Sequence, residues 1–293
     1  MKKVGFLGVG NVGGGMCKNL IEAGNHVTIF DINTKAMERF AGKASLAKNV
    51  LELLHESDTI FLSLPNSNTV ESIVAAFIEA GVKGKTIIDT STSYPGSTKN
   101  LAAQIKVAGG AMIDAPLLAG PAEAESGDLI LVVGGDEEEV NKVSDLLHAI
   151  SKSYSYLGES GSGHLMKLAV NFCSLSQALI LAQLYPVMEQ FGIGKKTVYD
   201  TLNNDIFNNW IFQFYSDKYV KEDYRLDFAL SLGLKDLSYM KRLYEEINIP
   251  GFLLDGALDL CRVSLLGEKE NEVRDFSYPA QTMADLIERS QKK

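Results

Sequence analysis

Cysteine, tryptophan and histidine are scarce in this chain of 293 residues, which holds three, one and four of them. Cys17, Cys173 and Cys261 lie too far apart for a paired or metal-binding spacing. We therefore expect no disulfide framework and a reducing, cytoplasmic setting. The histidines also lack metal-ligand spacing, so no metal site is predicted.

Positive charge is also in short supply, with 28 Lys and Arg against 37 Asp and Glu and a formal net charge of −9. This balance argues against nucleic acid and acidic membrane surfaces as partners. Lys2 and Lys3 lead directly into an apolar strand, and glycines and Asp31 interrupt the apolar run that follows. We therefore expect neither a signal peptide nor a membrane span there.

The apolar content of 46% allows one large core or, more consistently with the pattern, two. Four short apolar runs alternate with helical patterns, at 59–64, 86–89, 111–114 and 129–134. This alternation predicts an α/β fold with an N-terminal doubly wound (Rossmann) parallel sheet over residues 1–162. From 163 to 293 only helical patterns follow, which predicts an all-α domain for substrate binding and oligomerisation.

The expected helices of the second domain are 170–192, 195–202, 226–246, 252–266 and 280–290. Pro186 is expected to kink the first of them. Its segment 175–188 is almost wholly apolar, so we expect it to be buried on all sides. Such burial favours a homodimer or homotetramer, with a monomeric core as the alternative.

Three glycines at the spacing G-x-G-x-x-G follow the first apolar strand and open a helical pattern. This is the context in which the motif binds a dinucleotide: the turn is tight, the backbone can approach the pyrophosphate, and helix N-terminal amides bind the phosphates. The alternative is an ordinary strand-to-helix turn. The residues expected to contact the cofactor here are Gly8, Val9, Gly10, Asn11, Val12 and Gly13.

An acidic residue ends the second apolar strand, where the adenosine ribose hydroxyls are expected to bind. Asp31 lies 23 residues after Gly8 (31 − 8). Its charge would repel a 2′-phosphate, which favours NAD over NADP. Lys35 nearby keeps NADP possible, and Asp31 could instead cap a helix.

A second glycine-rich turn, at 161–163, opens a helix that carries Lys167 and Asn171 on one face. We expect the lysine in the first turn of this helix, where the dipole disfavours the charged ammonium and so suits proton transfer. Asn171 could then hold the group being protonated, while His164 in the turn could touch the substrate. The alternative is a solvated surface lysine.

With these motifs in this order, the chain resembles the β-hydroxyacid dehydrogenase family, typified by 3-hydroxyisobutyrate dehydrogenase, over essentially its whole length. Further segments match the family pattern: Leu64-Pro65, 89–95, Asp114-Ala115-Pro116, Phe228 and 235–237. The resemblance implies an oxidoreductase that transfers hydride between NAD(H) and a small 3-hydroxy acid or its semialdehyde. It also implies a C-terminal domain like that of 6-phosphogluconate dehydrogenase.

The family's residue roles carry over to matching positions. Lys167 corresponds to the general acid/base and Asn171 to the residue that orients the substrate. Ser91 and Thr92 correspond to contacts with the substrate carboxylate and the nicotinamide. The remaining cofactor contacts implied are Leu64, Pro65, Phe228 and Lys235.

Purely structural interpretations stay open for some of these residues. Pro65 could simply end a strand, Ser91 and Thr92 could cap a helix, and Lys235 could be solvated. For the whole chain, an imine-reductase-like enzyme and a silent NAD(P)-binding regulatory protein are the alternatives.

One loop departs from the family, which usually carries Ser-Gly-Gly where this chain has Leu118, Ala119 and Gly120, followed by Pro121. Leu118 removes a hydroxyl, Ala119 adds a methyl group and Pro121 lacks an N–H. We therefore expect these residues to line a more apolar substrate pocket. The substrate is a small carboxylic acid whose identity the sequence leaves open.

Overall fold

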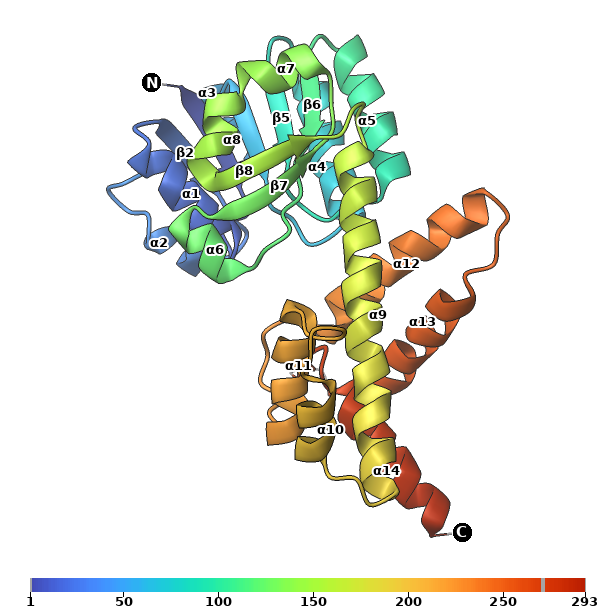
Figure 1. Ribbon diagram of the computed structural model, residues 1–293. Coiled ribbons are helices and arrows are strands. Elements are labelled where there is room, and N and C mark those ends of the chain that lie inside the picture. The colour runs from blue at the N-terminus through green and yellow to red at the C-terminus, as the bar shows by residue number, and fades with distance from the viewer. Residues whose placement is uncertain (1, 270–271, 293) are drawn as a thin grey trace. The chain divides into compact units, whose positions relative to one another are not determined.

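The computed structural model describes residues 2–269 and 272–292, and the chain divides into two compact units, Met1–Lys167 and Leu168–Lys293. The first unit contains all the strands of the described chain and the second contains helices only. The predicted fold class is therefore confirmed (Figure 1). The expected boundary at 162 and 163 falls at the start of the helix in which the two units divide.

A six-stranded parallel sheet forms the centre of the first unit, in the order β3-β2-β1-β4-β5-β6. Except for the two-residue edge strand β3, which is exposed, its strands are mostly buried apolar runs, as expected for a parallel sheet covered on both faces. They are β1 (Lys3–Leu7), β2 (His26–Phe30), β3 (Ser45–Leu46), β4 (Thr59–Leu62), β5 (Thr86–Asp89) and β6 (Ala111–Asp114). The strand order reverses at β1, the kind of position where open α/β sheets bind ligands.

Helices cover both faces of this sheet, because successive strand residues point to opposite sides. One apolar cluster joins the sheet to α1 and α8 through side chains such as Met16 and Leu147. The other joins it to α3, α4 and α5 through side chains such as Phe77 and Ile105. The helices are α1 (Gly13–Glu22), α2 (Thr34–Glu38), α3 (Val50–Glu56), α4 (Ser67–Ala80), α5 (Pro95–Val107), α6 (Pro121–Ser126), α7 (Glu137–Lys142) and α8 (Ser144–Ile150).

The apolar run at 129–134 does form a strand, but its place in the main sheet was predicted wrongly. It forms β7 (Leu129–Val133), which pairs in parallel with β8 (Ser151–Tyr156) in a separate two-stranded sheet. The pattern of β8, Ser-Lys-Ser-Tyr-Ser-Tyr, is largely exposed and polar, so it lacks the apolar signal of a buried strand.

The second unit is a bundle of helices around a core rich in aromatic side chains, among them Tyr185, Phe212, Tyr219 and Phe276. Its helices are α9 (Ser162–Gln190, which begins in the first unit), α10 (Lys195–Leu202), α11 (Trp210–Lys221), α12 (Leu230–Glu246), α13 (Phe252–Leu265) and α14 (Pro279–Gln291). The sequence missed α11, which is capped by the Asn209 side chain accepting from Phe212 N–H. The asparagine-rich segment before it, 203–209, obscures where its helical period begins.

Within the single chain, helix α9 is buried on one side and exposed on another. Ile180 is 60% exposed, although Leu175, Ala178 and Ala182 are buried. A uniformly apolar sequence does not reveal which face a helix turns to the core. By length and composition alone α9 could cross a membrane, a property that core helices of soluble proteins share.

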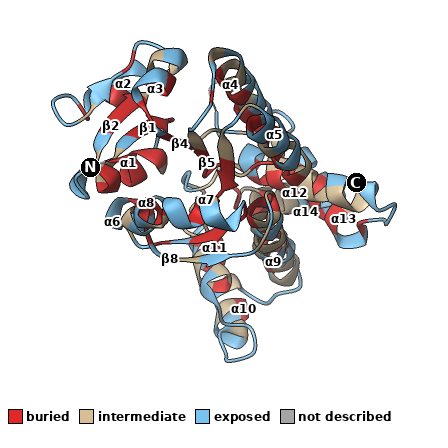
Figure 2. Cartoon of the chain, turned by 90° about the horizontal axis from the view of Figure 1, so that it is seen from above, coloured by how far each residue is buried: buried red, intermediate tan, exposed pale blue. Residues whose placement is uncertain are grey.

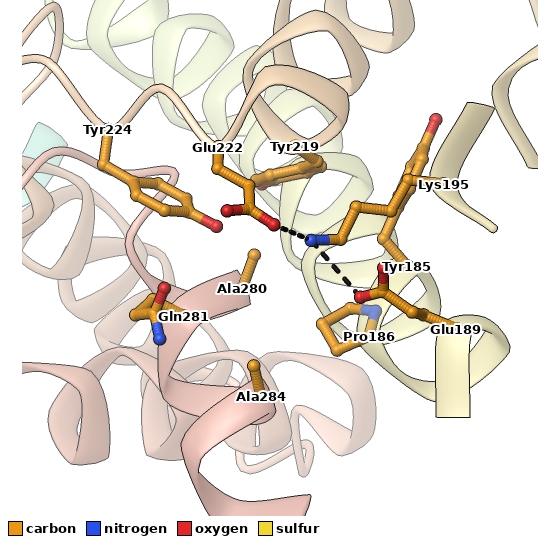
Figure 3. A pocket seen from close by; sticks show the side chains of 10 residues that line it. All are labelled: Tyr185, Pro186, Glu189, Lys195, Tyr219, Glu222, Tyr224, Ala280, Gln281 and Ala284. Carbon is orange, nitrogen blue, oxygen red and sulfur yellow. Dashed lines mark hydrogen bonds and ion pairs between the residues drawn. The ribbon is translucent and has the colours of Figure 1, made fainter.

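Four elements of the second unit enclose a cavity of about 210 Å³ (Figure 3). Lys195 of α10 lies at its wall, with Nζ 3.3 Å from Oε2 of Glu189 and paired with Glu222. Burial alone would lower the pKa of Lys195, but its hydrogen bonds to Glu222 and Glu189 outweigh burial and raise it. Lys195 therefore stays a cation that ties α10 to the ends of α9 and α11.

Candidate functional site

The carboxyl ends of the parallel strands bring several expected site residues to one edge of the sheet in the first unit. Gly8 follows β1, Asp31 follows β2, Leu64 follows β4 and Ser91 follows β5. Backbone bonds hold these ends in register: Gly8 N donates to Phe30 O at 3.0 Å. The strands thus assemble at one edge residues that are far apart in sequence.

Two glycines of the motif, Gly8 and Gly13, are required by the packing of the fold itself. Gly8 has a φ of +93°, and a Cβ there would lie 2.2 Å from Ser63 O. A Cβ on Gly13 would lie 2.0 Å from Gly8 O, so the helix could not approach the strand. These contacts explain the tight turn without any ligand.

Gly10 behaves differently. A Cβ built on it meets no atom within 4 Å, and its φ is not positive, so packing does not require glycine there. No side chain caps the N-terminus of α1 beside it. An open approach to backbone and uncapped helix amides together fit the pyrophosphate of a dinucleotide.

Asp31 is tied to the glycine loop. Its Oδ2 accepts a hydrogen bond from Val9 N at 2.8 Å, and its Oδ1 accepts one from Asn33 N at 2.8 Å. The capping side chain of α2 is Asn33, which accepts from Lys35 N, so the helix-cap interpretation of Asp31 is wrong. A carboxylate oxygen has further lone pairs, and these can accept from ribose hydroxyls.

Arg39 is a contact that the sequence did not reveal. Its guanidinium donates to the carbonyl of Gly10 at 2.8 Å and also to that of Val9. A Cβ on Gly14 would lie 1.5 Å from Arg39 Nη2, so a larger residue there would displace the end of the arginine side chain. Arg39 and Asp31 therefore hold the loop through its carbonyl and N–H groups respectively.

Ser91 is held by backbone and side-chain bonds at the end of β5. Leu64 N donates to Ser91 Oγ at 2.9 Å, and Ser91 N donates to the buried Asp89 carboxylate at 2.9 Å. Because Ser91 Oγ accepts a bond, its own hydrogen remains to donate. The following helix, α5, has Tyr94 as its N-cap, so Ser91 is not its capping residue. Thr92 is half-buried.

The loop after β6 uses much of its own hydrogen-bonding capacity. Leu118 N donates to Ile130 O at 2.9 Å, and Gly120 N donates to Glu123 Oε2 at 3.0 Å. Pro121 has no N–H to offer. With Leu118 and Ala119 half-buried, this loop presents an apolar surface followed by an acidic side chain.

Lys167 is the sixth residue of α9 and is half-buried. It therefore lies in the second turn, not the first as expected, and the helix dipole acts on it more weakly because that effect is confined to the terminal turn. His164 is fully buried, with its ring bonded to Thr98 and Ser91. The expectation that His164 could touch substrate is therefore wrong.

In the second unit, Asn171 and Lys235 meet at a carboxylate. Asn171 Nδ2 donates to Asp236 Oδ2 at 2.6 Å, and Lys235 Nζ lies 3.2 Å from Asp236 Oδ1. The Lys235 side chain is only 18% exposed, so it is not a solvated surface lysine. Asp236 was missed, although its position beside Lys235 was a signal.

Phe228 lies just before α12, where its ring packs against Phe276 at a centroid distance of 6.0 Å. Its backbone N–H donates to Asp275 Oδ2 at 2.9 Å. Leu64 is half-buried and Pro65 exposed at the end of β4.

Comparisons with known proteins identify the family of this chain. Residues 3–158 match the NAD binding domain of 6-phosphogluconate dehydrogenase, and residues 161–281 match the NAD-binding domain of NADP-dependent 3-hydroxyisobutyrate dehydrogenase. The chain is 30% identical over 258 residues to the mitochondrial 3-hydroxyisobutyrate dehydrogenase of Drosophila melanogaster, covering 85% of this chain and 80% of the relative.

Two further relatives differ in what they are named for. The 2-hydroxy-3-oxopropionate reductase of Escherichia coli is 29% identical, covering 80% of this chain and 82% of its own. A solved 3-hydroxyisobutyrate dehydrogenase of Mycobacterium tuberculosis with L-serine superposes with a TM-score of 0.86 at 23% identity, covering 97% of this chain and 99% of that one. The last comparison supports the fold.

Gly10→Ala tests whether the open approach at the glycine loop serves a ligand. We expect the thermal midpoint to stay unchanged, because the added Cβ meets no atom, while NADH binds at least about tenfold more weakly because the methyl group blocks the pyrophosphate. Fluorescence titration of NADH measures this. Gly256→Ala, whose Cβ is also unobstructed, is the control. Equal NADH affinity in all three proteins would contradict the assignment.

Proposed function

Because the chain belongs to the 3-hydroxyisobutyrate dehydrogenase-like family of NAD(P)-dependent β-hydroxyacid dehydrogenases, we propose that it interconverts a small 3-hydroxy acid and its semialdehyde with NAD(H) as the preferred cofactor. The observation that carries this proposal is the glycine loop held by Asp31, followed in the chain by a helix with Lys167 and Asn171. The alternatives are an imine-reductase-like enzyme and a silent NAD(P)-binding protein. Retention of Lys167 argues against both.

The proposed proton path uses Lys167. When the hydroxy acid is oxidised, its carbinol C–H leaves as hydride and its O–H proton passes to the neutral amine of Lys167; in reduction the ammonium returns that proton. A bound dinucleotide accepts or supplies the hydride. Water-free transfer requires the lysine close to the substrate oxygen, and its half-buried position on α9 is consistent with that requirement.

Two polar groups are proposed to hold the substrate. Ser91 has a hydroxyl hydrogen left to donate after accepting from Leu64 N, which suits a carboxylate. The Asn171 amide donates one N–H to Asp236, which leaves a second N–H for a substrate oxygen. Thr92 is proposed as a further contact beside Ser91.

The substrate is proposed as a chemical class, namely short hydroxy acids and their oxo acids. The relatives' names share short hydroxy and oxo acids, which supports that class here. In the loop of Leu118, Ala119 and Gly120, two backbone N–H groups donate hydrogen bonds within the protein. This supports a substrate that makes apolar contact with the loop. A turnover screen over short semialdehyde acids and their hydroxy acids tests the assignment.

Lys167→Ala is expected to lower kcat by roughly 10²- to 10⁴-fold, the range for loss of a positioned general acid/base. NADH affinity is expected to stay nearly unchanged, because other residues hold the dinucleotide. Lys167→Arg is expected to fail almost as badly, since guanidinium stays protonated. Steady-state kinetics measure both variants, with exposed Lys196→Ala as the control. Near-normal turnover by Lys167→Ala would refute the proton path.

NAD(H) is expected to exceed NADP(H) by at least about tenfold in kcat/KM, because the Asp31 carboxylate repels a 2′-phosphate. Asp31→Asn keeps a hydrogen-bonding group but removes the charge, so we expect it to narrow this preference. Parallel kinetics with both cofactors test the pair. Equal or better use of NADPH by the unaltered protein would contradict the prediction and point to Lys35 or Asn33 as a phosphate site.

The second unit supports a proposal of self-association as a homodimer or homotetramer. Helix α13 is exposed along part of its length (Figure 2). Large apolar side chains contribute to this exposure: Phe252 is 83% and Val263 40% exposed, and Leu266 just beyond the helix is 73% exposed. Their spacing of 11 and 14 residues places them on one side of the helix. Asp259 lies between Phe252 and Val263 on this side, so the exposed apolar side chains are separate from one another, and we propose that they pack against a second copy of the chain.

Phe252→Glu is expected to shift the protein towards monomer, because it places a charge on that face. Light scattering after size-exclusion chromatography measures the mass. Val107→Glu, at an exposed position in the first unit, is the control and is expected to leave the oligomer intact. An unaltered protein that is monomeric at micromolar concentration would refute this proposal.

A further inference from the structure

A buried histidine, His164, joins three elements of the first unit at the carboxyl edge of the sheet. Its side chain is fully buried, and so are Asp89 at the end of β5 and Asp114 at the end of β6. Nε2 lies 3.7 Å from Asp89 Oδ2, and Nδ1 lies 4.0 Å from Asp114 Oδ2. A buried imidazole destabilises a fold unless its nitrogens are bonded, so its partners carry information.

Asp114 fixes where α9 begins. Its Oδ1 accepts from Gly161 N at 2.7 Å and its Oδ2 accepts from His164 N at 2.9 Å. The glycines of the turn allow this approach: a Cβ on Gly163 would lie 2.5 Å from Val132 O and 2.9 Å from Asp114. The start of the helix that carries Lys167 is therefore held to β6 by backbone bonds that do not involve the imidazole.

The imidazole makes a different connection. Nε2 lies 3.1 Å from the carbonyl oxygen of Ser91, and Nδ1 lies 2.8 Å from Thr98 Oγ1 on α5. A carbonyl can only accept, so Nε2 carries the hydrogen and donates it to Ser91 O. The ring thus connects α9 to the loop after β5.

A continuous series of bonds follows from these contacts. Leu64 N, after β4, donates to Ser91 Oγ; Ser91 O accepts from His164; and Lys167 lies three residues after His164, about one turn along α9. The residue proposed to hold the substrate and the residue proposed to transfer its proton are joined through one ring.

We propose that His164 is a positioning residue: by donating from Nε2 to Ser91 O, it sets the distance between the Ser91 loop and the turn of α9 that carries Lys167. This inference rests on the proposed function of both residues. Its physical reason is that a misplacement of about 1 Å between substrate and catalytic group can cost about 10²-fold in rate. Asp114 holds the helix start, and His164 sets the loop against it.

Glutamine and asparagine carry the same amide group on side chains of different length. Substituting His164 by each of them therefore tests the roles of Nε2 and Nδ1 separately. In His164→Gln the longer side chain can bring its amide N–H to the place of Nε2 and keep the bond to Ser91 O. In His164→Asn the shorter side chain reaches only the place of Nδ1, near Thr98. We expect His164→Gln to retain kcat within about threefold, and His164→Asn to lose about 10- to 100-fold. NADH affinity is expected to be unchanged in both.

The measurements are kcat and KM with the best hydroxy acid, NADH titration and the thermal midpoint, with exposed His55→Asn as the control. Rescue of kcat by glutamine at a thermal midpoint equal to that of the asparagine variant supports positioning. Equal kcat for the two variants, whether both normal or both low, would overturn it, since packing alone does not distinguish Nε2 from Nδ1. If the unaltered protein binds NADH but turns over no hydroxy acid, the proposed function fails and positioning falls with it.

Discussion

Parallel pairing of β1 with β2 on one side and β4 on the other is the constraint on which the first unit depends. It puts every strand's carboxyl end at one edge, so that loops from remote parts of the sequence become neighbours. The glycine loop, Asp31 and Ser91 meet there without any of them being adjacent in sequence. The same edge receives the start of α9, where Asp114 accepts two helix amides.

Local signals accounted for much of this. Short apolar runs that alternate with helical patterns predicted β1, β4, β5 and β6, because a strand covered on both faces must be apolar throughout. They could not predict that β7 leaves the main sheet to pair with β8, because β8 is exposed and polar. Nor could composition show that Ile180 of α9 is exposed and lies outside the hydrophobic core of the second unit.

In the candidate site, too, some residues could be predicted from the sequence and others could not. Glycine spacing identified the loop after β1, since φ values and close contacts leave no other residue possible at Gly8 and Gly13. Arg39, which holds that loop, and His164, which bonds to the loop after β5, make contacts across tens of residues, and a single sequence carries no sign of such pairs. In the second unit, only its position beside Lys235 points to Asp236. The residues proposed to contact a ligand lie in motifs that the sequence shows, whereas the residues that orient them are brought into place by the fold.

The proposed function requires direct hydride transfer between a nicotinamide and the carbinol carbon of a short hydroxy acid. The most direct test uses NADH with deuterium at both positions of nicotinamide C4, a panel of short semialdehyde acids, and mass spectrometry and NMR of the product. We expect one deuterium on the carbinol carbon and none elsewhere. Product without deuterium on that carbon, or no reduction of any member of the panel by protein shown to bind NADH, would contradict it.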